Sequence, residues 1–233
     1  MPFAVPEPMP SADARRQPQK RTMGRFTPAR SPEEATRYAC ETLRVPVLDY
    51  RRKLVIANQV NAALHIAAGH GLAPPLQVAV DVDYFRRSSP TAWAVYVPSV
   101  AVHEGQYNQA IVLNPECDWE NLAAATRIRY AEGVFSTDHP QHVIFHELGH
   151  LAYHRHAPAA FGQPGRPDRP NRDNDRLFAE QVASIRGKVS RRAERNYREF
   201  VAEVFCMKLA GKRVPRAVSA LYNRLDGPRL KKR

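Results

Sequence analysis

The sequence predicts an α+β domain, because helix-like and strand-like patterns occupy separate stretches of the chain. Helical periodicity dominates residues 31–68 and 119–225, whereas short alternating runs gather between residues 77 and 113. An H-E-x-x-H pattern, from His146 to His150, lies within the later helical stretch. We therefore expect a small, mostly antiparallel sheet, a helix that carries this motif, and a mainly helical C-terminal part.

The chain divides into an N-terminal arm and one domain. Residues 1–30 are rich in Pro, Arg and Gln and contain too few apolar side chains to offset the entropy of ordering the chain. We interpret residues 1–30 as a flexible basic arm and residues 31–233 as a single domain. The domain begins at Ser31–Glu34, where a serine cap, a proline and a glutamate three residues later are typical of a helix start.

Two helices are expected before the strands. The first runs from the serine cap to about Leu43, and the second runs from about Asp49 to Ala68, where the glycines of Gly69–Gly71 end it. Proline-containing or polar segments then separate three strand-like runs, which are Gln77–Phe85, Ala92–Val97 and Ala110–Leu113.

Helical patterns resume after Pro115 and continue towards the C-terminus. One helix is expected over Trp119–Tyr130, and the next contains the H-E-x-x-H motif. Residues 157–175 are rich in Pro, Gly, Asp and Asn, which predicts an irregular loop that could gate a cleft. The last helices are expected at Arg176–Ile185, Arg191–Ala210 and Arg216–Leu225.

Composition limits the setting in which the protein works. No segment reaches the roughly 20 apolar residues that span a bilayer, so we expect no transmembrane segment and a protein that is cytoplasmic as synthesised. The three cysteines are widely spaced, which favours a reducing compartment over a disulfide framework. The formal charge of +12 is concentrated at the two ends, which could bind an anionic partner such as nucleic acid or an acidic protein.

The H-E-x-x-H motif predicts a zinc site on a helix. His146 and His150 are four residues apart, so both imidazoles project from one helical face and can reach one Zn²⁺. Glu147, one residue further round the helix, is placed to act as a general base towards a water molecule that zinc activates. The product of that chemistry is a hydrolysed amide.

A zinc site of this kind needs a third protein ligand, and two residues compete for the role. Glu199 and Glu203 share one face of a helix otherwise flanked by core residues, so Glu199 could bind zinc while Glu203 accepts the ring N–H of a ligating histidine. His156 lies ten residues after the first motif histidine, as in the longer H-E-x-x-H-x-x-G-x-x-H pattern. That pattern requires a glycine where this chain has Tyr153. His154 is expected on the helix surface.

The motif HELGH, followed by a later helix that reads EFVAEVF, resembles the glutamate-zincin peptidases, most closely the catalytic domain of the anthrax lethal-factor type. The resemblance is carried by these two motifs, with a compatible order of elements over residues 76–211. It implies a zincin-like fold, a zinc metallopeptidase activity on a protein or peptide, Glu199 as the third ligand and Glu203 as its supporting acid. Such domains occur in bacterial toxins, effectors and phage-encoded proteins, which implies delivery to a host cell or packaging in a virion.

The same resemblance leaves one catalytic role open. Peptidases of this family stabilise the oxyanion with a Tyr or His that points into the site. Tyr197 lies about 200° round the helix from Glu199 and should face away from the zinc. Arg192, Arg195 and Tyr222 remain candidates for this donor.

Peptide substrates of zincins lie extended beside an edge strand, and the expected edge is Ala92–Val97 or Ala110–Leu113. Two alternatives to a peptidase stay open. The chain could be a basic nucleic-acid-associated or virion-associated structural protein that retains the fold, or it could hydrolyse a non-peptide amide with the same water chemistry.

Overall fold

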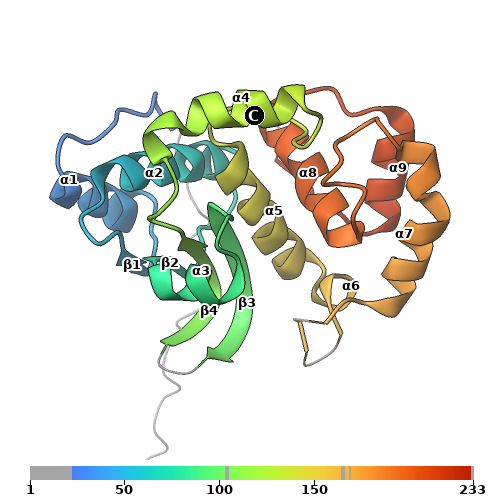
Figure 1. Ribbon diagram of the computed structural model, residues 1–233, viewed down its shortest axis with the longest axis horizontal. Coiled ribbons are helices and arrows are strands. Elements are labelled where there is room, and N and C mark those ends of the chain that lie inside the picture. The colour runs from blue at the N-terminus through green and yellow to red at the C-terminus, as the bar shows by residue number, and fades with distance from the viewer. Residues whose placement is uncertain (1–22, 103–104, 164–165, 168, 232–233) are drawn as a thin grey trace, which may run out of the picture.

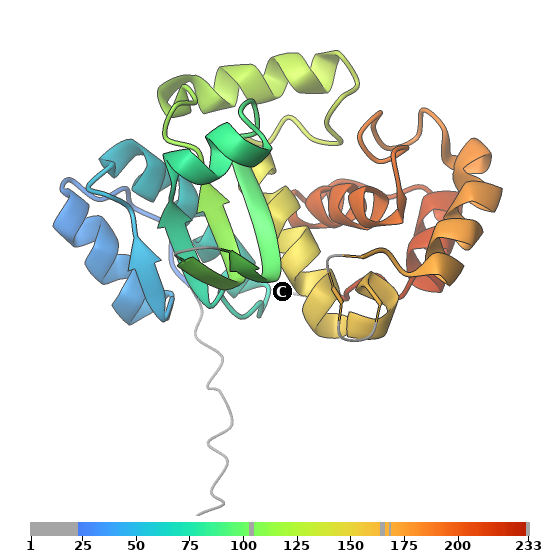
Figure 2. The ribbon, with the colours of Figure 1, turned by 60° about the horizontal axis from the view of Figure 1, so that its bottom comes forward.

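The computed structural model describes residues 23–102, 105–163, 166–167 and 169–231, and it has the predicted α+β class. Four strands form one sheet in the order β1-β2-β4-β3 (Figures 1 and 2). Its strands are β1 (Val47–Asp49), β2 (Gln77–Val80), β3 (Ala94–Val102) and β4 (Gly105–Leu113).

The expectation of a mostly antiparallel sheet is wrong, because the sheet is mixed. β1 pairs with β2 in parallel, and β2 pairs with β4 in parallel. Only β3 and β4 form an antiparallel pair, which is the hairpin between consecutive strands. Helix α2 (Leu54–Gly69) supplies the crossover that a parallel β1–β2 pair requires.

Two boundaries differ from the sequence prediction for identifiable reasons. The expected strand Gln77–Phe85 stops at Val80, because the Asp81 side chain accepts a hydrogen bond from the Tyr84 amide and begins α3 (Val82–Ser88). The region around Asp49, expected to begin the second helix, belongs instead to β1. In the first case a helix cap ends the strand despite the alternating apolar pattern. In the second, pairing within the sheet replaces the expected start of a helix.

The N-terminal helices cover one side of the sheet (Figure 1). The predicted Ser31 cap is present and begins α1 (Pro32–Arg37), which continues as the π-helical turn η1 (Tyr38–Thr42). Residues 1–22 of the predicted arm lie outside the described residues. Residues 23–30 run along α2, where Ala29 exchanges backbone hydrogen bonds with the Asn58 side chain.

The C-terminal half is helical, as predicted. Helix α5, which carries the motif, lies between the sheet and the last three helices, and α4 crosses above it in both views (Figures 1 and 2). Part of the predicted 157–175 loop is helical, in α6 and the first turn of α7. The elements are η2 (Trp119–Asn121), α4 (Leu122–Ala131), α5 (His142–His156), α6 (Pro158–Phe161), α7 (Arg172–Ile185), α8 (Tyr197–Leu209) and α9 (Arg216–Arg224).

Within the described part of the chain, no helix combines the length and the apolar character needed to cross a membrane.

Candidate metal centre

The candidate site forms where α5 and α8 approach each other closely. Gly149 of α5 faces Ala202 of α8, and a Cβ atom added to Gly149 would lie 2.9 Å from the Cα atom of Ala202. Only a residue without a side chain fits this contact. Asn196 caps the start of α8 by accepting a hydrogen bond from the Glu199 amide, so this helix begins just before Glu199 and points it at the motif.

Glu199 and the two motif histidines meet at this contact. The Nε2 atoms of His146 and His150 are 3.0 Å apart, and the Glu199 carboxylate oxygens lie 3.3 Å and 3.2 Å from them, respectively. Donors bound tetrahedrally to Zn²⁺ at ordinary bond lengths are roughly 3.3 Å apart. The spacing and chemistry of these three side chains therefore fit a zinc ion, and we call them the outer group.

The competing ligand lies elsewhere. His156 is exposed at the end of α5 and is not part of the outer group. His154 is half-buried rather than on the helix surface, because its Nδ1 atom is hydrogen-bonded to the Tyr96 hydroxyl at 2.7 Å and its ring stacks on Phe161.

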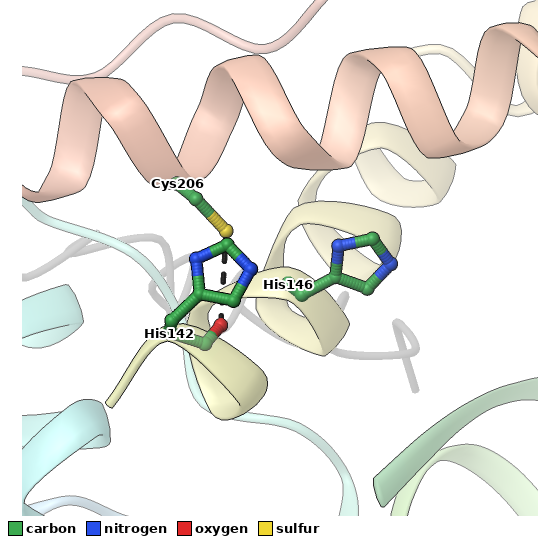
Figure 3. A group of neighbouring side chains, drawn as sticks. All are labelled: His142, His146 and Cys206. Carbon is green, nitrogen blue, oxygen red and sulfur yellow. Dashed lines mark hydrogen bonds between the residues drawn. The ribbon is translucent and has the colours of Figure 1, made fainter. Parts of the chain in front are cut away.

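A second set of side chains that could hold a metal ion consists of His142, His146 and Cys206, which we call the inner group. All three are buried, and Figure 3 shows the Cys206 thiol reaching from α8 to the first turn of α5. Its Sγ atom donates to the His142 carbonyl at 3.8 Å, and burial raises the pKa of this thiol well above its usual value. Because metals bind the thiolate, an ion at the inner group would have to displace the proton that burial holds on this thiol.

The nitrogens of His142 also have partners within the protein. Its Nδ1 atom lies 3.0 Å from the Thr137 hydroxyl, and its Nε2 atom lies 3.2 Å from the Glu203 carboxylate. Sequence reasoning did not identify His142, although it lies one turn before His146 on the same helical face.

Glu203 is fully buried and accepts four hydrogen bonds. Its Oε1 atom lies 2.8 Å from His146 Nδ1 and 3.2 Å from His142 Nε2, and its Oε2 atom accepts from the Ser136 amide and the Ser190 hydroxyl. Burial alone would raise the pKa of Glu203, but the two histidines hold it well below its ordinary value. The charged carboxylate thus fixes the His146 ring with Nε2 towards the outer group, as the sequence predicted for a supporting acid.

The electrostatics of His146 follow from its two carboxylate neighbours. Burial and nearby Arg192 lower its pKa, but Glu199 and Glu203 outweigh them and raise it to about 9. In the metal-free protein the two acids therefore favour the protonated, positively charged form of the His146 ring. A metal ion held by the outer group would take the place of a proton on Nε2 and would keep positive charge between the two acids.

Glu147 points away from the inner group and towards a cavity of about 780 Å³. Its Oε2 atom accepts a hydrogen bond of 2.7 Å from the Tyr96 amide of β3, and its side chain is almost fully buried. Glu147, His150 and Glu199 all line this cavity. The predicted base thus lies on the wall of the same cavity as two residues of the outer group.

Arg192 connects the base and the predicted third ligand. Its Nε atom donates to Glu199 at 2.7 Å, and its Nη2 atom lies 4.0 Å from Glu147. Of the other residues considered for the oxyanion, Arg195 lines the cavity, whereas Tyr222 is buried and donates to the Pro228 carbonyl. Tyr197 faces away as expected and donates to the Phe161 carbonyl.

No model of a known protein family, no curated protein and no solved structure matches this chain.

Proposed function

We propose that this protein is a zincin-like, zinc-dependent metallopeptidase whose ion is held by His146, His150 and Glu199. The observation that carries the proposal is the meeting of three side chains, with the two histidine Nε2 atoms 3.0 Å apart and each 3.2–3.3 Å from one oxygen of Glu199, and with Glu147 on the same cavity wall. A retained structural scaffold has no physical need for this pairing of a metal-sized donor set with an adjacent carboxylate.

Each side chain then has a defined task. Zinc, when bound, supplies the Lewis acidity that polarises a scissile carbonyl and lowers the pKa of an attacking water to about 7. Glu147 accepts a proton from that water and delivers it to the departing amine, so the amide is exchanged for an acid and an amine. Arg192, which lies beside both carboxylates, would be placed to stabilise the developing oxyanion.

The outer edge of β3 offers a place for an extended peptide. The Tyr96 amide donates a hydrogen bond to Glu147 and so faces away from β4. The carbonyl of Trp93, three residues earlier, faces the other way and accepts from the Asn114 amide. By the alternation of an antiparallel pair, the backbone groups of Ala94 and the carbonyl of Pro98 also face away from β4, and both residues line the cavity. Of the two strands predicted as possible edges, only β3 lies at an edge of the sheet, because β4 lies between β2 and β3. A peptide paired with β3 would pass Glu147.

The setting of the activity follows only from the resemblance to lethal-factor-type domains. We propose a protein or peptide as the substrate, and a role as an effector, a toxin or a phage-associated protease that is delivered to a host cell or packaged in a virion.

The test compares zinc content and cleavage of a mixed protein library for the wild type, Glu147→Ala and Glu199→Ala. We expect about one zinc per chain and cleavage for the wild type, retained zinc without cleavage for Glu147→Ala, and loss of both for Glu199→Ala. Arg216→Ala, on the exposed start of α9, is the matched control for handling and folding. A wild-type protein that binds no zinc but binds DNA in a salt-sensitive manner would favour the nucleic-acid-associated alternative.

A further inference from the structure

The cavity wall carries more positively than negatively charged side chains, and this excess indicates the kind of substrate that the proposed peptidase accepts. Two acids line the cavity, Glu147 and Glu199, and both already have partners in the site. Four arginines line the same cavity, namely Arg129, Arg192, Arg195 and Arg198. A bound zinc ion would increase the positive charge further.

Two of these arginines are engaged by the protein itself. Arg192 donates to Glu199, and Arg198 donates to the carbonyl oxygens of Phe161 and Arg169 while its guanidinium lies over the Phe161 ring. Their positions are therefore fixed by internal contacts. Arg198 therefore shapes the wall of the cavity, and Arg192 is held beside the two carboxylates of the proposed catalytic site, so neither is free to bind a side chain of the substrate.

The other two arginines are available to a ligand. Arg195 is exposed, and no carboxylate of the described residues forms an ion pair with it. Arg129 forms one ion pair, with Glu132 at 3.3 Å, and both side chains are about half exposed. An ion pair between two exposed side chains is weak, so a substrate carboxylate can displace Glu132.

The fold brings these two cations to the same end of the cavity. The carbonyls of Gly133 and Val134, which follow α4, accept hydrogen bonds from the amides of Arg191 and Arg192. The last turn of α4, with Arg129, is thereby joined to the loop that carries Arg195. Apolar side chains that line the same cavity include Trp93, Leu122, Phe135 and Val143.

We propose that this end of the cavity, between α4 and the loop before α8, is a subsite for an acidic side chain of a peptide substrate. Arg129 and Arg195 bind the carboxylate, and the apolar wall contacts the methylene groups that carry it. The inference rests on the proposed peptidase function for its substrate class, but the subsite also binds an acidic peptide in the absence of cleavage.

The test measures binding rather than turnover. Fluorescent octapeptides of Ala and Gly, with Glu, Gln or Lys placed at each position in turn, are titrated into zinc-loaded, full-length Glu147→Gln protein. We expect the Glu peptide to bind about tenfold more tightly than the Gln peptide at one or two positions, and the Lys peptide to bind most weakly. Arg195→Glu should reverse the preference between Glu and Lys, and Arg129→Ala should reduce it.

Arg216→Glu is the matched control, because it makes the same change of charge at an exposed position outside the cavity. Equal binding of the Glu and Lys peptides, or an equal effect of Arg195→Glu and Arg216→Glu, would overturn the subsite. Cleavage by the wild type without an acidic preference would overturn it while leaving the peptidase intact. A preference for acidic peptides in binding, without any cleavage, would support the subsite and contradict the proposed peptidase activity.

Discussion

The inner and outer groups share His146, yet the two sides of this residue are built differently. On the inner side, the Nδ1 atom of His146 meets Glu203, which is held by two histidines, a backbone amide and a serine hydroxyl. On the outer side, the Nε2 atom meets His150 and Glu199 at the wall of a cavity. The inner side is therefore a completed hydrogen-bond network, whereas the outer side borders a cavity.

This difference indicates that the two sides of the α5–α8 contact have different roles. The inner network fixes the direction of the His146 ring at the cost of burying a charged carboxylate, which is tolerated because every oxygen has two donors. The outer side can then present three donors at the separation of a metal ion with little reorganisation. In the proposed metal centre, one face of the α5–α8 contact would support the ligands and the other would hold the ion.

The largest effect is expected from Gly149→Val, which should disrupt both the inner hydrogen-bond network and the outer group. A branched side chain at this position must overlap the backbone of Ala202, so α8 has to move away from α5 together with Glu199 and Glu203. We expect a loss of about 3 kcal/mol in the free energy of unfolding and no measurable zinc binding. Chemical denaturation and zinc titration measure these quantities.

Gly24→Ala is the control for this prediction, because a Cβ atom at Gly24 meets no other atom within 4 Å. It should leave both quantities unchanged. Wild-type zinc affinity in Gly149→Val would show that the close approach of the helices does not position the ligands.

A smaller effect is expected from Glu203→Gln, which changes the inner network and leaves the outer donors in place. The amide has one acceptor oxygen, so it cannot serve all four donors, and its NH₂ group faces hydrogen-bond donors. We expect zinc affinity to fall about 10-fold to 100-fold with the fold retained. Glu203→Ala would leave buried donors unpaired and is expected to cost about 3–5 kcal/mol of stability.

Glu180→Gln provides the matched control for Glu203→Gln, because Glu180 is exposed on α7 and pairs only with Arg176 among the described residues. It should keep wild-type zinc affinity. The same affinity in Glu203→Gln, measured by competition with a chelator, would remove the supporting role of Glu203.

The sequence predicted those parts of the site that repeat with the helical period. His146 and His150 are four residues apart, as are Glu199 and Glu203, and each pair lies on one face of its helix as expected. The choice of Glu199 over His156 was left open by spacing alone, because it depends on how α8 crosses α5. That crossing depends on Gly149, whose role is visible only when its neighbour Ala202 is known.

The parts that sequence reasoning missed depend on contacts between distant segments. Ser136 and Ser190 lie in loops, and no periodicity marks either as a partner of Glu203. The parallel pairing of β2 with β4 was missed for a similar reason, because a strand pattern shows which face is apolar but not which neighbour the strand takes.

The smallest effect on zinc binding is expected from Cys206→Ala, and it separates the two groups most directly. Removing a buried sulfur atom from the inner side should cost about 1 kcal/mol of stability. Zinc affinity should change by less than about threefold, because the outer donors and Glu203 stay in place. If the ion instead occupied the inner group, the same substitution would remove one of its three ligands and zinc affinity would fall by orders of magnitude. Cobalt-substituted protein gives an independent measurement, since ligation by Cys206 would produce a thiolate-to-metal charge-transfer band that the outer group cannot give.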